Sequence, residues 1–430
     1  MSSETPETRR PSPSSGGMPV VAMVGGGQLA RMTHQAAVAL GQRLRVLAAS
    51  HDEPAALVTP DVVLGTHTEL ADLRRLADGA TVVTFDHEGV PTEHLHELVA
   101  QGVTVSPPPQ ALLYAQDKLA MRRRLSEMGL PIPDFADLAP AADAGVDART
   151  LLDDFWTRHD GRIVLKAIRG GYDGRGVWMP DSLDEARQIL LDAQSSDSAL
   201  IAEQKVSMRR ELSAMVARSE FGQGAVWPVV ETVQRNGQCA VVIAPAPDLS
   251  DDLAEAAERI ALRLAADLGV VGVMAVELFE TTTPGPDGGR LLINELAMRP
   301  HNSGHWSMDG AVTGQFEQHL RAVLDYPLGD TRSRAPVTVM GNILGAAQAP
   351  TMSMDERLHH LMARMPDAKV HLYAKGERPD RKIGHVNVVG GPGSISDPDY
   401  VAAVRERAER AAHWMSTAVW TDGWDEHSDG

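Results

Sequence analysis

Two apolar runs in the second half of the chain, each carrying a carboxylate, most constrain what this sequence can fold into. Val270–Glu280 contains Glu277, and the run that begins at Leu292 contains Asn294 and Glu295. The connector between them is rich in Thr, Pro and Gly, so the runs predict an antiparallel pair of strands. Pairing would bring Glu277 and Glu295 together on one face. Two carboxylates and an amide oxygen are hard ligands that suit Mg²⁺, whereas an ion pair with Lys or Arg is the alternative.

A second constraint is the loop Gly170–Gly176, which has four glycines in seven positions and lies between two apolar runs. Lys166 lies inside the first of these runs, where an ammonium group is costly to bury unless an anion meets it. Glycine backbone can approach a polyphosphate closely and can move as a lid, so the loop predicts a phosphate-binding lid. A plain hairpin turn is the alternative, although it would need fewer glycines. No Gly-Lys-Ser or Gly-Lys-Thr opens a helix here, which excludes a P-loop.

The N-terminal part has the pattern of a buried strand, a glycine turn and a helix, beginning at Pro19. Gly25, Gly27 and Ala30 fit the dinucleotide fingerprint G-x-G-x-x-G/A, in which amides at a helix N-terminus meet an anion. The second strand, Leu44–Ala49, has no carboxylate at its tip, so the ribose-binding part of the fingerprint is missing. The turn therefore predicts a phosphate site without a dinucleotide, a tight strand-to-helix connection, or an NAD site.

Alternating strands and helices extend this unit and predict a doubly wound α/β domain that ends at three consecutive prolines, 107–109. Asp86 and Glu88 follow one strand at its carboxyl end, where such sheets bind ligands, with a solvated loop as the alternative. The expected strands are Val62–Leu64, Thr81–Phe85 and Val103–Ser106, and the expected helices are Glu69–Ala77 and Thr92–Ala100.

Downstream, a helix is expected at Gln110–Met128, and its basic run, Lys118 with Arg122 to Arg124, is typical of a solvated face. The pair Asn236-Gly237 between apolar runs predicts a hairpin. The other expected elements are a surface connection at Ala139–Thr150, helices at Ser182–Ala193, Ser250–Leu268, Thr313–Leu324 and Tyr400–Met415, strands at Val337–Leu344 and Lys369–Ala374, and a fraying end at Asp422–Gly430.

Two acids and one basic loop are further candidates for ligand binding. Glu203 ends an apolar run and Glu211 begins an alternating one. An acid leaving a strand can accept from a ribose hydroxyl or an adenine amine, or it can lie on an ordinary surface. The run Lys375–His385 concentrates four cations, which in an acidic protein can clamp a phosphate; solubilising charge is the alternative.

Composition excludes several broad classes of protein. With 43% hydrophobic residues in 430, the chain can form two or three domains with apolar cores. Its net charge of −18 argues against a nucleic-acid-binding protein, which needs a basic face. No apolar run approaches the length that spans a membrane. A single cysteine, Cys239, excludes an intramolecular disulfide and a zinc–cysteine site, and fits a reducing cytoplasm.

Four motifs resemble, in the same order, those of the N5-carboxyaminoimidazole ribonucleotide synthetases, ATP-grasp enzymes of purine biosynthesis. They are Gly25-Gly-Gly-Gln-Leu29, Gly170-Gly-Tyr-Asp-Gly-Arg-Gly176, Asn294-Glu-Leu-Ala297 and His301-Asn-Ser-Gly-His-Trp306. The resemblance implies an α/β ATP-grasp fold with a Rossmann-like N-terminal (pre-ATP-grasp) domain, a small lid domain and a central mixed-sheet domain. The expected bounds are a disordered tail at 1–17, the Rossmann-like domain at 18–109, the lid subdomain and linker at 110–208, the central and C-terminal domain at 209–415, and a C-terminal tail at 416–430.

The resemblance also implies a role for each matching residue. ATP would be held by Lys118, Lys166, Gly171, Gly174, Gly176, Glu203, Gln204, Val206, Glu211, Asn294 and Glu295. Mg²⁺, or Mn²⁺ in its place, would be bound by Glu277, Asn294 and Glu295. The ribonucleotide would face Gly27, Gln28, Leu29, Glu88, Tyr172, Asp173, Arg175, His301, Asn302, Ser303, Lys375, Arg378, Arg381 and Lys382. Catalysis would fall to Lys166, Arg175 and Arg299, and we infer, separately from the resemblance, that Arg299 lies on the bicarbonate side.

The implied reaction carboxylates 5-aminoimidazole ribonucleotide with bicarbonate and ATP, through carboxyphosphate. The implied partners are these small molecules, with no nucleic acid and no membrane, and the implied enzyme is a cytoplasmic homodimer. Three alternatives stay open: another ATP-grasp ligase, such as a biotin carboxylase or an enzyme like glycinamide ribonucleotide transformylase; an NAD-dependent dehydrogenase; and a non-catalytic nucleotide-binding regulator.

Overall fold

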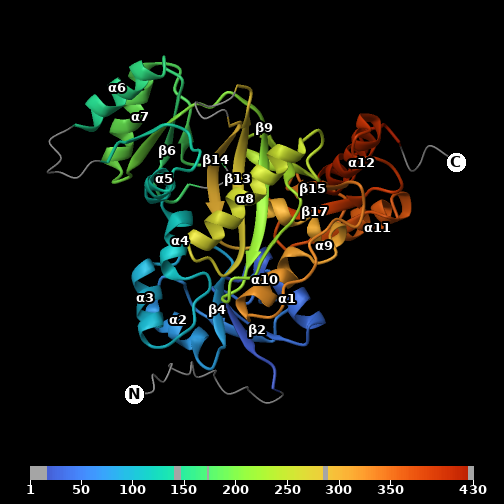
Figure 1. The fold of residues 1–430 in the computed structure, drawn as a ribbon. Coiled ribbons are helices and arrows are strands. Elements are labelled where there is room, and N and C mark those ends of the chain that lie inside the picture. The colour runs from blue at the N-terminus through green and yellow to red at the C-terminus, as the bar shows by residue number, and fades with distance from the viewer. Residues whose placement is uncertain (1–16, 140–146, 172–173, 284–288, 425–430) are drawn as a thin grey trace.

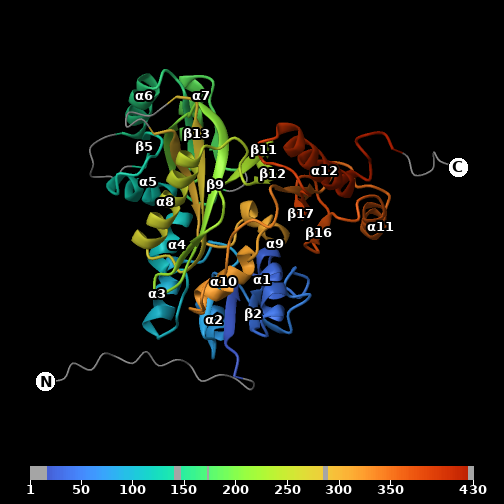
Figure 2. The ribbon, with the colours of Figure 1, turned by 45° about the vertical axis from the view of Figure 1, so that its right-hand side comes forward.

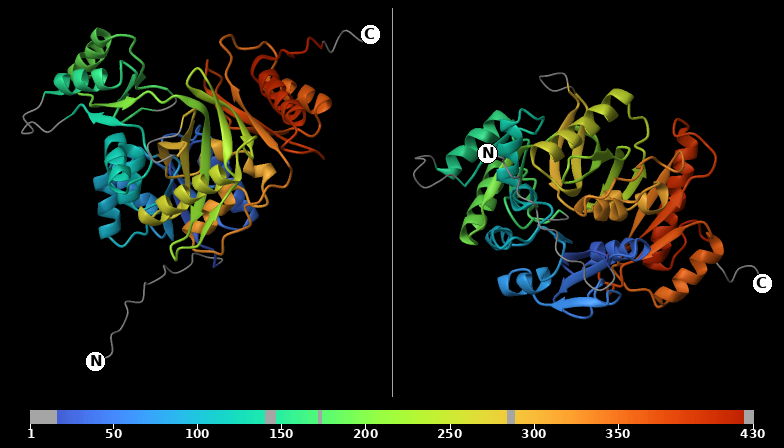
Figure 3. Two further views of the ribbon diagram at one scale, coloured as in Figure 1. Left: turned by 45° about the horizontal axis from the view of Figure 1, so that its top comes forward. Right: turned by 60° about the horizontal axis from the view of Figure 1, so that its bottom comes forward.

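The computed structural model describes residues 17–139, 147–171, 174–283 and 289–424, so the tail expected at 1–17 lies outside it apart from Gly17. Within these ranges the strands form three sheets (Figure 1). The N-terminal sheet, in blue, lies below the central sheet in Figure 1, and the green lid sheet and the red C-terminal helices lie at opposite sides of it. Figure 2 keeps this arrangement, and Figure 3 shows the same parts from two further directions, with the lid sheet and the C-terminal helices again on opposite sides.

The N-terminal sheet is parallel and has the order β3-β2-β1-β4, which confirms the expected doubly wound unit. β1 is buried along its whole length, as expected for a parallel strand covered on both faces. The strand expected at Val103–Ser106 is wrong: one parallel bridge joins Val105 to Val83, and Pro107 then has no N–H to continue the ladder. The elements are β1 (Val20–Val24), α1 (Gln28–Ala39), β2 (Arg43–Ala48), β3 (Asp61–Leu64), α2 (Leu70–Ala77), β4 (Val82–Phe85) and α3 (Thr92–Ala100).

The single helix expected at Gln110–Met128 is also wrong, because the structure has two helices there, α4 (Pro109–Gln116) and α5 (Lys118–Glu127). Asp117 between them is extended, with φ −130°, and its carboxylate accepts from the amide of Ala120 at 2.8 Å. Aspartate is a favoured N-cap, so this residue ends one helix and begins the next.

The lid sheet is antiparallel in the order β5-β8-β6-β7, and α6 and α7 cover it through one apolar cluster. β6 and β7 flank the glycine-rich loop, as the sequence predicted, and Lys166 lies in β6. The connection expected at Ala139–Thr150 ends earlier, because α6 begins at Ala148; residues 140–146 are outside the described part. The elements are β5 (Phe135–Asp137), α6 (Ala148–Arg158), β6 (Ile163–Ala167), β7 (Val177–Trp178), α7 (Leu183–Ser195) and β8 (Leu200–Gln204).

The central sheet has nine described strands in the order β14-β13-β9-β11-β12-β15-β17-β16, with β10 beside β9. The pairings of its strands are antiparallel rather than mixed. The expected hairpin is present, and its turn is formed by Asn236 and Gly237, both with positive φ. The strands are β9 (Met208–Arg218), β10 (Gly224–Val226), β11 (Val230–Arg235), β12 (Gln238–Ala244), β13 (Gly272–Thr281), β14 (Leu291–Ala297), β15 (Thr338–Leu344), β16 (Lys369–Leu372) and β17 (Lys382–Val389). The helices are α8 (Asp251–Asp267), a 3₁₀ turn at Asn302–Gly304, α9 (Ser307–Gly310), α10 (Gln315–Val323), α11 (Met354–Arg364) and α12 (Pro398–Thr417).

The C-terminal end stays packed on the protein further along the chain than the sequence suggested. Trp420 stacks on Trp414 with ring centroids 4.4 Å apart, and Asp422 pairs with Arg364 at 2.6 Å and with Arg410 at 3.2 Å. The fraying expected from Asp422 is therefore wrong for that residue, and residues 425–430 are outside the described part. Among the described residues, no helix combines the length and apolarity needed to cross a membrane.

Candidate active site

The two carboxylates lie opposite each other on β13 and β14, as the sequence predicted. Glu277 is the register partner of Glu295, and the next paired residues are Leu278 and Ile293, so Asn294 is the extra residue of a β-bulge. A bulge interrupts the alternation of side chains along a strand. The amide of Asn294 can therefore reach the carboxylate of Glu277, 3.5 Å away, although Asn294 is adjacent to Glu295.

Two lysines from other elements contact Glu295 and its neighbour Asn294. Lys118, at the start of α5, forms an ion pair with Glu295. Lys166, on the lid sheet, binds the Asn294 side-chain oxygen at 3.1 Å and the Glu203 carboxylate at 2.7 Å. Residues far apart in the sequence, from α5, the lid sheet and the central sheet, are thus brought together, and β11 adds Gln234, whose amide donates to Glu211 at 2.9 Å.

The protonation of Glu277 shows how much negative charge gathers here. Burial, the Glu295 carboxylate and the Glu211 carboxylate raise the pKa of Glu277 to about 7. A divalent cation between Glu277 and Glu295 would remove this repulsion, and Asn294 supplies a third oxygen. The donor set therefore fits Mg²⁺, which usually takes its remaining oxygens from water and substrate phosphates.

Glu203 and Arg122 differ most from expectation. Arg122, which the sequence placed on a solvated face, is fully buried and donates to Glu203 at 2.7 Å. Burial alone would raise the pKa of Glu203, but Arg122 and Lys166 outweigh it and lower that pKa to about 2. Each carboxylate oxygen of Glu203 is engaged by one of these two cations, and the expected contact of Glu203 with ATP stays a prediction.

His301 faces the carboxylate pair with its Nε2 3.4 Å from Glu277. Burial and the nearby Arg299 and Lys382 lower the pKa of His301 to about 3, so its ring is neutral. The Ser303 amide donates to His301 Nδ1 at 3.4 Å, which leaves the ring proton on Nε2, toward Glu277.

Ser303 was expected to contact the ribonucleotide, but its side chain lies behind His301. It is buried, and its hydroxyl is 2.9 Å from His301 Nδ1 and 2.8 Å from the hydroxyl of Ser213 on β9. Asn302 is likewise held, by two hydrogen bonds with Asn342 of 3.0 and 2.8 Å. The loop after β14 is therefore fixed from behind by the central sheet.

Arg299 reaches across to the N-terminal domain, where Glu88 accepts from it at 2.8 Å. Glu88 was expected to face the ribonucleotide, and here it lies at the expected carboxyl end of β4 and holds Arg299. The contact ties the loop that carries His301 to the N-terminal sheet.

The glycine turn before α1 is closed by a carboxylate. Asp86 accepts from the amides of Gly27 at 2.6 Å and Ala30 at 3.1 Å, and a Cβ on Gly27 would lie 2.2 Å from an Asp86 oxygen. Because these amides already bind an anion, the interpretation as an NAD site loses its support. The structure favours the alternative of a tight strand-to-helix connection.

The basic loop after β16 reaches the same helix terminus. Lys375 donates to the Gln28 side chain at the start of α1, and the contact of both residues with the ribonucleotide stays a prediction. The side chain of Leu29 packs in a buried cluster with Met32, Phe316 and Tyr373, and the expected contact of Leu29 with the ribonucleotide stays a prediction.

Several other predicted contacts lie at or near the surface. Gln204, Gly174, Arg175 and Arg378 are exposed, and Val206, Gly171, Gly176, Arg381 and Lys382 are partly exposed. Tyr172 and Asp173 lie outside the described residues.

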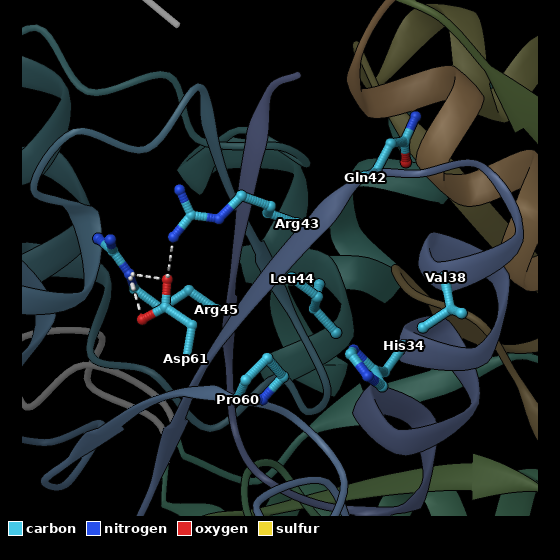
Figure 4. A pocket seen from close by; sticks show the side chains of 8 residues that line it. All are labelled: His34, Val38, Gln42, Arg43, Leu44, Arg45, Pro60 and Asp61. Carbon is cyan, nitrogen blue, oxygen red and sulfur yellow. Dashed lines mark hydrogen bonds and ion pairs between the residues drawn. The ribbon is translucent and has the colours of Figure 1, made fainter. Parts of the chain in front are cut away.

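A hollow on the N-terminal domain lies apart from this site. It is formed by α1, β2 and the start of β3, and Asp61 pairs there with Arg45 at 3.1 Å (Figure 4). Its lining residues are His34, Val38, Gln42, Arg43, Leu44, Arg45, Pro60 and Asp61, and no predicted site residue is among them.

Family models match most of the chain. Residues 18–116 match the ribonucleotide synthetase pre-ATP-grasp domain, residues 123–316 the ATP-grasp domain, and residues 338–392 the phosphoribosylaminoimidazole carboxylase C-terminal domain. The chain is 62% identical over 420 residues to the N5-carboxyaminoimidazole ribonucleotide synthase of Mycobacterium tuberculosis, covering 98% of this chain and 93% of that one.

Solved structures of synthetases also match nearly the whole chain. The crystal structure of the ADP complex of an N5-carboxyaminoimidazole ribonucleotide synthetase matches with a TM-score of 0.79 and 30% identity, over 94% of this chain and 99% of that one. The Aspergillus clavatus enzyme in complex with ADP and 5-aminoimidazole ribonucleotide matches with a TM-score of 0.78 and 29% identity, over 91% and 99%. With these matches along nearly its whole length, the chain belongs to the N5-carboxyaminoimidazole ribonucleotide synthase family of ATP-grasp enzymes.

Proposed function

We propose that this protein carboxylates the exocyclic amine of 5-aminoimidazole ribonucleotide, using bicarbonate and ATP and releasing ADP and phosphate. The observation that carries the proposal is the pair Glu277 and Glu295 in register, with the bulged Asn294 between them and two lysines against them. Oxygen ligands beside ammonium groups form a site for a metal-bound polyphosphate.

ATP would lie between the lid sheet and the central sheet. Lys118 and Lys166 would contact its phosphates, and Glu277, Asn294 and Glu295 would hold Mg²⁺, which neutralises phosphate charge when bound. The glycine-rich loop supports this placement, since it lies so close to the β11–β12 hairpin that a Cβ on Gly174 would lie 3.3 Å from the carbonyl oxygen of Gly237.

The ribonucleotide would lie between the N-terminal domain and the basic loop. Gln28 from α1 and Lys375 from the loop meet there, while the neutral His301 faces Glu277 from the loop after β14. Arg175, Arg378, Arg381 and Lys382 are the further cations proposed for its phosphate and base.

The reaction follows from bringing these sites together. A bicarbonate oxygen attacks the γ-phosphorus of ATP, ADP leaves, and carboxyphosphate forms. The amine then attacks the carboxyl carbon, phosphate leaves, and the amine nitrogen loses a proton. Most of the rate enhancement would come from positioning and from charge neutralisation by Lys166 and Arg299, while the closed lid keeps water from the intermediate.

ADP release with and without the ribonucleotide tests the proposal directly, with labelled bicarbonate followed into product. Ribonucleotide-dependent ADP release with one label per ADP is the expected result. ADP release without incorporation would favour another ATP-grasp ligase, and no ADP under any condition would favour a binding or regulatory role. We further propose a cytoplasmic homodimer, which fits the family resemblance and the single cysteine, and which light scattering of the purified protein would test.

A further inference from the structure

Arg122 joins the lid sheet to the strand that carries the proposed metal ligands. It is fully buried and lies one helical turn after Lys118 on α5, so both side chains face the same neighbours. Its Nε donates to Glu203 at 2.7 Å, and its two terminal nitrogens donate to the backbone carbonyl oxygens of Ile293 at 3.1 Å and Asn294 at 2.7 Å. A planar fork of donors is needed to reach all three acceptors at once.

These contacts close a ring. Glu203, held by Arg122, binds Lys166 through its other oxygen, and Lys166 donates to the side chain of Asn294. The backbone carbonyl of that same Asn294 accepts from Arg122, which returns the ring to its start. The ring therefore fixes the ammonium of Lys166 and the bulge at Asn294 relative to each other, although they belong to different sheets.

We propose that Arg122 is a positioning residue for the carboxylation reaction, acting through Lys166 and Asn294 without touching the substrates. The proposal rests on the proposed function, in which these two residues hold the phosphates and the metal. A lysine is a point charge on a flexible stem, so its position must be set by partners such as Glu203. Losing outer partners of this kind typically costs about 10–100-fold in affinity or activity.

The test compares Arg122→Lys with Arg123→Lys, a matched change on the same helix. A lysine at 122 can keep the ion pair with Glu203 but cannot also reach both carbonyl oxygens, whereas Arg123 is 60% exposed and pairs with Asp137 on the surface. We expect Arg122→Lys to lower kcat/KM for ATP by about 10–100-fold, with Arg123→Lys close to wild type. A merely structural role would lower the unfolding temperature of Arg122→Lys and leave its kinetics, measured well below that temperature, like those of the control; that result would overturn the proposal.

A second comparison shows whether Arg122 acts through Lys166. Lys166→Met should weaken ATP use strongly in the wild-type background and much less in the Arg122→Lys background, because the lysine is already displaced there. Equal losses in both backgrounds would overturn the proposal. If Arg122→Lys does not fold, the double variant Arg122→Gln/Glu203→Gln removes both buried charges together, which cores tolerate better. A folded double variant should show the same kinetic loss, and wild-type kinetics in it would overturn the proposal.

Failure of the proposed function is recognisable separately, because wild-type protein would then show no ribonucleotide-dependent ADP release. Calorimetric titration with MgATP then replaces kinetics. Weaker binding of MgATP by Arg122→Lys than by Arg123→Lys supports the positioning role of Arg122, and equal affinity of the two variants overturns it.

Discussion

At the residue level, the charged groups of the site neutralise one another. Lys118 pairs with Glu295, Lys166 with Glu203, and Arg299 with Glu88. A divalent cation that takes Glu295 would release Lys118, and a phosphate placed beside the cation would then accept from that ammonium. The same groups can thus serve the ligand-free and the nucleotide-bound protein, because each charge exchanges one partner of opposite sign for another.

Glu295→Gln and Glu277→Gln should each abolish turnover, because a neutral amide cannot replace a carboxylate that binds Mg²⁺. Both variants should remain folded, since glutamine keeps the size and the hydrogen-bonding capacity of glutamate. ADP release and far-UV circular dichroism would be measured together. Normal kinetics in either variant would contradict the metal assignment for that residue.

Lys375→Ala tests the basic loop. Loss of one charge-assisted hydrogen bond to a phosphate costs about 1.5–3 kcal/mol, so KM for the ribonucleotide should rise by roughly 10- to 100-fold while KM for ATP changes little. Lys369→Ala, on an exposed position of β16, is the control. If both substrates show the same change in KM, Lys375 belongs outside the ribonucleotide site.

At the element level, local conformation decides which side chains enter the site. The positions of β13, β14 and the glycine-rich loop could be predicted, because apolar runs and clustered glycines are local patterns. The helix break at Asp117 has a local signal, the aspartate cap that accepts from Ala120. The bulge at Asn294 could not be predicted, since it depends on the pairing of β14 with β13 across the sheet. Arg122 was missed for a similar reason: a basic run looks solvated unless the buried Glu203 opposite it is known. One local signal could have revealed its burial. Lys118 directly follows an aspartate cap, and Arg122 lies four residues later, on the same face of the helix.

The contact between the glycine-rich loop and the β11–β12 hairpin gives a prediction at this level. Gly174 and Gly170 both have positive φ, +76° and +77°, so alanine strains the backbone equally at either position, by about 1–2 kcal/mol. Only at Gly174 would the new Cβ meet a neighbour, the Gly237 carbonyl oxygen at 3.3 Å; at Gly170 it meets nothing within 4 Å. Gly174→Ala should therefore raise KM for ATP or the ribonucleotide more than Gly170→Ala does. Matching kinetics in the two variants would mean that the loop–hairpin contact has no part in substrate binding.

At the scale of the whole molecule, the site exists only where the N-terminal, lid and central parts meet. The largest apolar core joins the N-terminal and central parts through α4 and α5, from Val24 and Phe85 through Leu112 and Met121 to Leu212 and Val276, whereas the lid sheet has a core of its own. Apolar patterns predicted that each of these segments is buried, but which segments share one core could not be read from periodicity. The polar contacts across the boundaries, such as Arg299 with Glu88, were likewise not predictable.

One such boundary contact makes folding stability depend on pH. His319 on α10 is fully buried; the amide of Val273 on β13 donates to its Nδ1 at 3.1 Å, and its Nε2 lies 2.8 Å from the hydroxyl of Thr84 on β4. Burial lowers the pKa of His319 to about 3, from the ordinary 6.5 that it regains on unfolding. Between these values the unfolded chain binds a proton that the folded protein does not, so this residue lowers stability as pH falls below about 6.5.

His319→Gln should therefore flatten the fall in stability on acidification. At pH 4.5 the effect of this one histidine in the wild type is about 2–3 kcal/mol, because each pH unit below 6.5 contributes about 1.4 kcal/mol. Glutamine can accept from Val273 and donate to Thr84, so this contact between the N-terminal and central sheets should persist at pH 7. Urea midpoints at pH 7 and 4.5 would measure the difference, with His96→Gln, at an exposed position of α3, as the control. If His319→Gln loses as much stability on acidification as wild type and the control, the buried neutral histidine does not cause the loss of folding stability at low pH.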